Sequence, residues 1–149
     1  MSDKQSNNLS TIAPYIPPTL MKSILASKEL PLEPVVEDFE AAVMFADISG
    51  FTPLTEALAQ KGAEGPEELT RILNGYFTRM IALIESEGGE AVQFSGDAVT
   101  VVFPTRGETK GMAVKRAMQA AKAMQAAMSD FRELKTSIGI VTLQMTISI

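Results

Sequence analysis

The stretch "EAVQFSGDAVTVVF", residues 90–103, constrains the fold more than any other part of this chain. Two strand-like runs, 90–94 and 98–103, are separated only by Ser95-Gly96-Asp97. Two such runs around a tight glycine turn predict a β-hairpin. The sheet that contains this hairpin is therefore expected to be antiparallel.

A strand and a short helix are expected before the hairpin. Residues 40–47 carry an apolar run without polar alternation, which predicts a central strand. The next segment predicts a helix over 52–60, with Thr52 as N-cap and Pro53 at its first position.

Two longer helices are expected on either side of the hairpin. The first begins at Pro66 and ends at Gly88-Gly89. Its expected core residues are spaced at three and four: Leu69, Ile72, Leu73, Tyr76, Phe77, Met80, Ile81 and Ile84. The second helix covers 110–128 and is expected to turn these residues inward: Val114, Ala117, Met118, Ala121, Met124 and Met128. Residues 135–149 form a final strand region of one or two strands.

The resulting order, β-α-β-β-α-β, predicts an α+β, ferredoxin-like fold with an antiparallel sheet and helices on one face. The globular domain is expected over 39–149. Residues 1–38 are expected to hold a flexible tail (1–10), a short helix that starts at Pro17-Pro18, and an extended linker.

Composition narrows the chemistry. The 149 residues include no Cys and no His, which excludes thiol catalysis, zinc–thiolate sites and a histidine base. Any metal must be held by oxygen, which favours Mg²⁺, Mn²⁺ or Ca²⁺. A net charge of −5 argues against nucleic acid as a partner. The chain has neither a membrane-span run nor a signal-peptide segment, and a cytoplasmic location is expected.

Two aspartates stand out. Asp47 ends the first strand, and Asp97 lies in the turn of the hairpin that should pair with it. Both should emerge at the same edge of the sheet, where two carboxylates can hold divalent ions about 3.5–4 Å apart for phosphoryl chemistry. The carbonyl of Ile48 is a further candidate ligand. The alternative is that each acid is only a turn or cap residue.

The loop after Asp47 predicts a phosphate cradle. Ser49, Gly50, Phe51 and Thr52 lie at a helix N-terminus, where backbone N–H groups bind phosphate oxygens without a cation. Other polar or sulfur-bearing side chains have ordinary explanations. Four glutamates are expected to be solvated helix charges: Glu56, Glu64, Glu67 and Glu68. Four methionines are expected to fill the core: Met112, Met118, Met124 and Met128.

These residues resemble a known family. "VMFADISGFTPLTE" (43–56) resembles the first metal motif of the class III nucleotidyl cyclases, and "GGEAVQFSGDAVTVVF" (88–103) resembles their second. "TSIGI" (136–140) resembles the start of the following strand. The resemblance covers residues 39–140 and is closest to the soluble, bicarbonate-responsive adenylyl cyclase branch.

The resemblance implies an enzyme that converts ATP to cyclic AMP and pyrophosphate, or GTP to cyclic GMP, with ATP favoured. It implies two Mg²⁺ or Mn²⁺ ions on Asp47, Asp97 and the Ile48 carbonyl, with residues 49–52 around the phosphates. The family's site forms between two cyclase domains. A homodimer or tandem partner is therefore expected.

The sequence departs from the family in two places. Four residues before the second aspartate, adenylyl cyclases carry a purine-selecting Lys and guanylyl cyclases a Glu, whereas this chain has Gln93. Gln93 therefore marks the base-reading position, or a regulatory one, without choosing ATP or GTP. In the family, an Asn and an Arg come from later elements, and this sequence ends at Ile149 before them. The chain is therefore expected to be the N-terminal portion of the domain, either a fragment or a naturally shortened form, and inactive or nearly so alone.

Two alternatives remain open from the sequence. One is a catalytically degenerate cyclase-like module that binds metal–nucleotide or serves as a regulatory dimerisation domain. The other is a diguanylate cyclase, whose Gly-Gly-acid-acid-Phe signature lies at the hairpin turn. Here that turn is Ser95-Gly96-Asp97, and "GGE" (88–90) comes before the hairpin.

Overall fold

The computed structural model describes residues 16–27, 36 and 38–149, and the chain forms two compact units, Met1–Phe39 and Glu40–Ile149. In the first unit, helix α2 spans Pro18–Ser27, which confirms the helix start expected at Pro17-Pro18. The tail expected over 1–10 and most of the expected linker lie outside the described residues.

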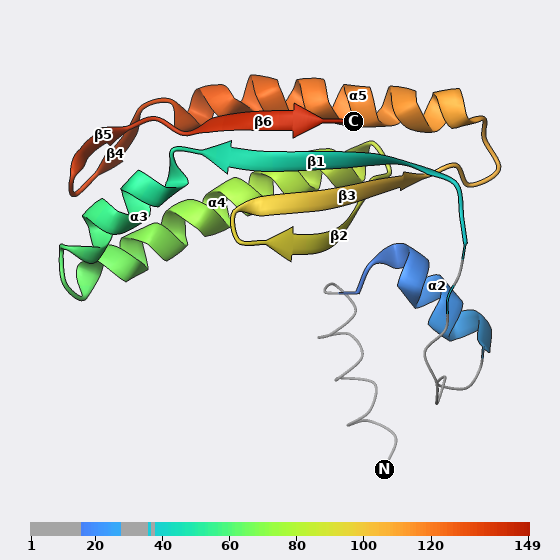
Figure 1. The fold of residues 1–149 in the computed structure, drawn as a ribbon, viewed down its shortest axis with the longest axis horizontal. Helices are drawn as coiled ribbons and strands as arrows, with labels where there is room; N and C mark the ends of the chain where they lie inside the picture. Colours follow the sequence, from blue (N-terminus) through green and yellow to red (C-terminus); the bar gives the residue numbers. More distant parts are fainter. Residues whose placement is uncertain (1–15, 28–35, 37) are drawn as a thin grey trace, which may run out of the picture. The chain divides into compact units, whose positions relative to one another are not determined.

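The second unit carries the expected strands and helices, followed by a more divided C-terminal segment (Figure 1). In chain order these are β1 (Ala41–Ser49), α3 (Phe51–Ala59), α4 (Glu64–Ser86), β2 (Glu90–Ser95), β3 (Ala98–Pro104), α5 (Lys110–Ala127), the 3₁₀ helix η2 (Met128–Phe131), β4 (Leu134–Thr136), β5 (Gly139–Val141) and β6 (Gln144–Ser148).

The main sheet has four strands in the order β2-β3-β1-β6, and each neighbouring pair is antiparallel. Helices α4 and α5 pack on one face of this sheet (Figure 1). The ferredoxin-like order and the helices on one face confirm the expected fold class. The first strand lies beside the hairpin, as the sequence predicts.

Strand β1 differs from the expectation in its burial. It is central, but its side chains alternate between buried and exposed along the whole strand. Ala42, Met44 and Ala46 face the helices, whereas Val43 and Phe45 are 40% and 56% exposed on the opposite face. The apolar run therefore does not indicate burial on both sides. One face of the strand is covered by the helices, and the other is apolar but uncovered.

Helix α4 confirms the predicted stripe. Ile72, Tyr76, Met80 and Ile84 are buried at a spacing of four residues, and Leu69, Leu73 and Phe77 pack beside them. The helix begins at Glu64, two residues before the predicted Pro66. It ends where Gly88 adopts φ +72°, a left-handed conformation that glycine adopts without strain.

Helix α5 confirms part of the predicted inward set: Ala117, Met124 and Met128 (in η2) are buried, and Ala121 is partly buried against the core. Its buried residues are mostly small, and the complete set is Ala113, Ala117, Ala120, Met124 and Ala127. Val114 and Met118 are instead 41% and 49% exposed, and Met112 is also exposed. Alanines let this helix approach the sheet closely, and the larger residues lie on the neighbouring face.

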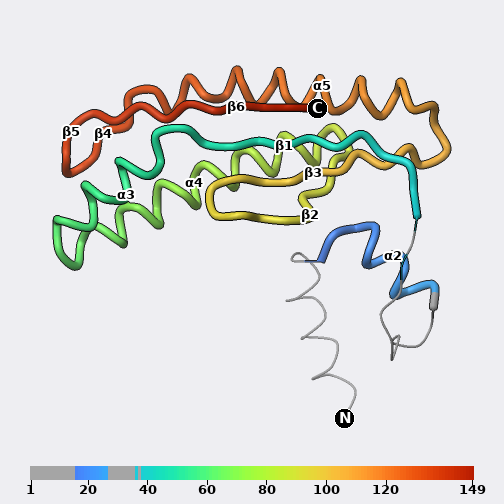
Figure 2. Tube along the Cα trace, viewed as in Figure 1, coloured from blue at the N-terminus to red at the C-terminus, as the bar shows by residue number. Residues whose placement is uncertain are grey.

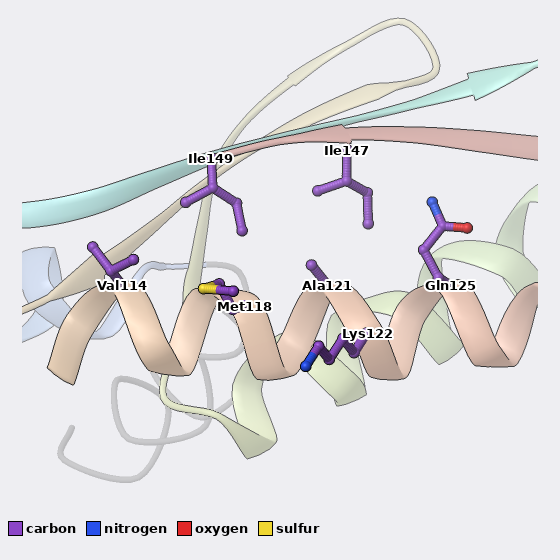
Figure 3. Close-up of a pocket in the computed structure, with 7 residues that line it drawn as sticks. All are labelled: Val114, Met118, Ala121, Lys122, Gln125, Ile147 and Ile149. Carbon is purple, nitrogen blue, oxygen red and sulfur yellow. The ribbon is translucent and has the colours of Figure 1, made fainter. Parts of the chain in front are cut away.

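The outward residues of α5 line an apolar groove against strand β6. Figure 3 shows Val114, Met118 and Ala121 opposite Ile147 and Ile149. The groove between them has a volume of about 640 Å³. The groove is open because β6 is the edge strand of the main sheet. No helix among the described residues is both long and apolar enough to cross a membrane.

The C-terminal region contains three short strands rather than one or two. Strands β4 and β5 form a separate two-stranded sheet, and only β6 joins the main sheet. Gly139, at φ +116°, lets the chain turn back after Thr136, whose hydroxyl donates to the Gly139 carbonyl over 2.7 Å. A side chain at position 139 would be strained there.

Candidate functional site

The two aspartates meet at one end of the sheet. Strands β1 and β3 are antiparallel, and their last backbone pair at this end is Ala46 with Val99. Asp47 directly follows that pair on β1, and Asp97 lies in the β2–β3 turn, two residues before Val99. The turn has only two residues, and Gly96 adopts φ +65° in it. The sheet therefore places Asp47 and Asp97 at the same edge, as the sequence predicts.

The Tyr76 side chain of helix α4 lies within range of the charges of both acids. Its ring is 1% exposed and packs edge-to-face on Phe77 and Phe131. Burial first, and then the negative charges of Asp47 and Asp97, together raise the pKa of Tyr76 to about 12. Tyr76 thus contributes a neutral hydroxyl near both acids.

Neither carboxylate is neutralised within the described part of the chain. The ion pairs of this part involve other acids, and neither Asp47 nor Asp97 makes a side-chain hydrogen bond there. Asp47 is exposed and Asp97 is half-buried. Two adjacent carboxylates without a cationic partner are a suitable donor set for a hard divalent cation.

The pair does not form a closed metal cage by itself. In the described ranges 16–27, 36 and 38–149, no three Asp, Glu, His or Cys residues cluster closely enough to hold an ion. Mg²⁺ commonly takes one or two carboxylates and fills its remaining positions with water and substrate phosphate oxygens. The donor set fits a cation that arrives with a phosphate ligand.

The helix after the cradle loop begins two residues earlier than predicted. Gly50, not Thr52, is the N-cap of α3, and Phe51 is the first helical residue. Gly50 adopts φ +92°, where a side chain would be strained, and no side chain caps the helix. Pro53 lies in the first turn, where it lacks only an N–H that the helix does not use. The N–H groups of Phe51 and Thr52 are therefore left for an anion.

Gln93 lies on the same uncovered face of the sheet as Asp47. It pairs with Thr100 of β3, and Thr100 pairs with Phe45 of β1. Directly paired residues of a sheet share a face, and Phe45 is two residues from Asp47 on one strand. Gln93 is exposed and donates to the Ser95 hydroxyl over 3.4 Å.

Three further residues lie around the site: Ile48, which the sequence predicts, and Tyr76 and Thr142, which it does not. The Ile48 side chain is buried at 3% exposure, which anchors the backbone between Asp47 and Ser49. Sequence reasoning missed the Tyr76 hydroxyl, because the spacing of α4 marks Tyr76 only as a core residue. It also missed Thr142, whose carbonyl oxygen would lie 3.3 Å from a Cβ at Gly50.

Comparison with known families gives one match over most of the chain. The sequence profile of the adenylate and guanylate cyclase catalytic domain matches residues 36–149.

Curated relatives cover shorter parts. Adenylate cyclase type 10 of Oryctolagus cuniculus is 37% identical over 75 residues, which is 49% of this chain and 5% of that protein. The photoactivated adenylate cyclase subunit alpha-like protein FB of Euglena gracilis is 32% identical over 99 residues, or 66% of this chain and 9% of that protein. The chain therefore spans less than a tenth of the length of either relative.

Solved structures support the same fold. The adenylyl cyclase CyaB from P. aeruginosa is 30% identical with a TM-score of 0.59, and the alignment covers 72% of this chain and 56% of that one. A bacterial light-regulated adenylyl cyclase reaches a TM-score of 0.68 at 18% identity, with 97% of this chain and 40% of that chain covered. At 18% identity the latter supports the fold alone.

Proposed function

Because the chain belongs to the adenylate and guanylate cyclase catalytic domain family, we propose that it supplies the metal-binding half of an adenylyl cyclase site. The reaction converts ATP to cyclic AMP and pyrophosphate in cyclic-nucleotide signalling. One observation carries the proposal: the unneutralised carboxylates of Asp47 and Asp97 lie at adjoining strand ends, next to the open N-terminus of α3.

Each group of residues has a proposed task. Asp47, Asp97 and the Ile48 carbonyl hold two Mg²⁺ or Mn²⁺ ions. The ions, when bound, supply Lewis-acid activation of the ribose 3′-hydroxyl and neutralise the triphosphate. The backbone amides of Phe51 and Thr52 bind the phosphate oxygens. Gly50 lets the phosphates come close to the backbone, and Ser49 adjoins it on the same loop.

The chemical change is a displacement at phosphorus. The ribose 3′-oxygen loses its proton and forms a bond to the α-phosphorus, and the bond from that phosphorus to the bridging oxygen breaks. Pyrophosphate carries the electron pair away. Asp47 and Asp97 would serve this step by holding the cations where the phosphates must lie. Little reorganisation of the site is then needed during reaction.

Gln93 is the proposed base-reading or regulatory position. Its amide both donates and accepts, so it can bind the edge of adenine or guanine. ATP is favoured because the curated relatives described above are named adenylate cyclases. A cytoplasmic location is proposed, because the substrate nucleoside triphosphates are available there and the sequence holds no cysteine.

A second cyclase domain is the proposed partner, as a homodimer or a tandem neighbour. Val43 and Phe45 leave apolar area on the sheet face that carries Asp47 and Gln93, and such area suits a protein interface. The site is open on this face, and residues from a partner would complete it. The 149-residue chain alone is therefore expected to form little or no cyclic AMP.

Calorimetry tests the proposal. A non-hydrolysable ATP analogue should bind the chain in the presence of Mn²⁺ and bind much more weakly in its absence. Asp47→Asn and Asp97→Asn should each abolish the metal-dependent part, whereas Asp130→Asn, an exposed acid of η2, should not. Equal binding with and without Mn²⁺ would count against the proposal.

The second candidate is a degenerate module that binds metal–nucleotide or a partner without turnover. Gln93 favours it, because neither the Lys nor the Glu that the cyclase resemblance implies occupies that position. A complex with an active partner domain separates the two. Cyclic AMP formation that depends on Asp47 supports the catalytic role, and binding without turnover supports the module.

A further inference from the structure

The tip of the β4–β5 hairpin is bound to helix α4 by one carboxylate. The Ser137 N–H donates to both oxygens of Glu68, over 3.1 and 3.2 Å, and the Ser137 hydroxyl donates to Oε2 over 2.6 Å. The Glu68 side chain is only 16% exposed. It also forms an ion pair with the largely exposed Arg71, whose guanidinium nitrogen lies 3.6 Å from Glu68 Oε1. The sequence expectation that Glu68 is a solvated helix charge is therefore wrong.

The other end of the hairpin reaches the cradle. Strand β5 ends at Val141, and the next residue, Thr142, places its carbonyl oxygen 3.3 Å from where a Gly50 Cβ would lie. Gln144 then pairs with Ser49 on strand β1. Figure 2 shows the trace running from the hairpin into β6 beside the turn between β1 and α3.

Helix α3 joins the cradle to α4 on the other side. The carbonyl oxygen of Leu58, near the end of α3, lies so close to Gly65 of α4 that a Cβ there would stand 1.9 Å away. These contacts form a ring. It runs from Gly50 along α3 and α4 to Glu68, across the hydrogen bonds to Ser137, and along the chain to Thr142, which lies beside Gly50. The Glu68–Ser137 bonds close this ring of contacts.

The carboxylate suits this task at neutral pH. Hydrogen bonding from the Ser137 hydroxyl, more than any other cause, lowers the pKa of Glu68 from its usual value. The ionised carboxylate can accept three hydrogen bonds, and such charge-assisted bonds are stronger than neutral ones.

We propose that Glu68 and Ser137 are positioning residues for the phosphate cradle, holding the β4–β5 hairpin so that Thr142 fixes the backbone of residues 50–52. This rests on the proposed role of that backbone in binding phosphate. Neither side chain touches the nucleotide. Loss of the bonds should loosen the cradle and weaken triphosphate binding, because misplacement of binding groups lowers affinity without removing any contact group.

Ligand-free NMR relaxation of the full chain tests the positioning itself. Glu68→Gln, which keeps the size but not the charge, and Ser137→Ala should each lower the backbone order parameters of residues 50–52. Ser137→Ala removes the hydroxyl bond and keeps the two bonds from the backbone N–H, so its effect should be the smaller one. The double variant should lose less than the sum of the two single changes, because both affect the bond from the Ser137 hydroxyl to Glu68. Glu67→Gln, a neighbouring exposed acid, and Ser137→Thr, which keeps the hydroxyl, should leave these amides unchanged. Unchanged order parameters in Glu68→Gln would overturn the proposal.

Binding of a non-hydrolysable ATP analogue with Mn²⁺ gives the second readout. Affinity should fall about threefold to tenfold in Glu68→Gln and Ser137→Ala and stay at the parent value in the two controls. A loss that is equal in Glu67→Gln would also overturn the proposal. If the parent chain does not bind the analogue, the proposed function fails, and the order parameters alone still decide whether Glu68 and Ser137 position the loop.

Discussion

Gly65 of α4 lies against the carbonyl of Leu58 in α3, and a Cβ at position 65 would stand 1.9 Å from that oxygen. The close approach lets α3 dock on α4 while Leu54 and Leu58 enter the core. Gly65→Ala should force the helices apart and destabilise the protein by about 1–3 kcal/mol, as overpacking does elsewhere. Urea denaturation followed by circular dichroism measures the change.

Gly75 is the matched control in the same helix. A Cβ there meets nothing within 4 Å, and the position is exposed. Gly75→Ala should therefore stabilise the protein by about 0.5–1 kcal/mol through helix propensity alone. Equal effects of the two substitutions would show that the contact with Leu58 does not constrain α4.

Arg116 of α5 should contribute more to stability than any exposed cation of that helix. Its guanidinium donates to the carbonyls of Glu87, Gly88 and Pro104, which lie at the end of α4 and the end of β3. Arg116→Ala removes these bonds and leaves carbonyls unsatisfied, which should cost about 2–4 kcal/mol. Thermal or urea unfolding measures the loss.

Lysine cannot replace this arginine, because one ammonium does not match the fork that reaches three carbonyls. Arg116→Lys should therefore recover only a minor part of the loss. Lys115→Ala, at an exposed position of the same helix, should change stability by less than about 0.5 kcal/mol. A near-neutral Arg116→Ala would contradict the importance of this contact.

The raised pKa of Tyr76 should make the free energy of unfolding fall at alkaline pH. Its pKa is about 12 in the folded protein, chiefly through burial and then through Asp47 and Asp97, against about 10 when unfolded. Since the folded pKa is the higher one, the stabilising contribution is complete below pH 10 and is lost as the pH rises towards 12. Between pH 9 and 11 the free energy of unfolding should fall by about 1–2 kcal/mol from this group.

Tyr76→Phe isolates that contribution. The ring keeps its packing on Phe77 and Phe131, while other groups that titrate in this range are common to both proteins. The stability difference between parent and variant should therefore change with pH in the direction given. Parallel curves from pH 9 to 11 would show that folding does not raise the pKa of Tyr76.

The sequence predicts the parts of the fold that depend on spacing. Large apolar residues four apart identify the buried face of α4, and the short Gly96-Asp97 turn pairs β2 with β3. The placement of Asp47 and Asp97 at one edge follows from this turn together with the pairing of β1 and β3. It needs no knowledge of side-chain packing.

Burial of individual faces could not be predicted in the same way. Val43 and Phe45 are apolar but lie on the sheet face that α4 and α5 leave uncovered, so hydrophobicity does not mark the inner side of β1. In α5 the inward face is made of alanines, whose small apolar signal is weaker than that of Val114 and Met118. Both errors arise because close packing, not residue hydrophobicity, decides which face is covered.

The helix start after β1 was predicted in place but not in detail. Thr52-Pro53 is a common helix start, yet Gly50 takes the N-cap because its left-handed backbone turns the chain out of β1. The carbonyl beside this turn comes from Thr142, 92 residues later in the numbering, and the proposed support comes from the Glu68–Ser137 bonds, which also join residues far apart in the sequence. Such long-range contacts have no local sequence signal.

Electron paramagnetic resonance of Mn²⁺ can count the ions held at the acid pair. With a non-hydrolysable ATP analogue present, the parent chain should bind two Mn²⁺ ions per nucleotide site, and Asp130→Asn should do the same. Asp47→Asn with Asp97→Asn should bind no more Mn²⁺ than the free analogue does, while keeping the parent's circular dichroism spectrum. Undiminished Mn²⁺ binding by that double variant would contradict the assignment of Asp47 and Asp97 as the metal ligands.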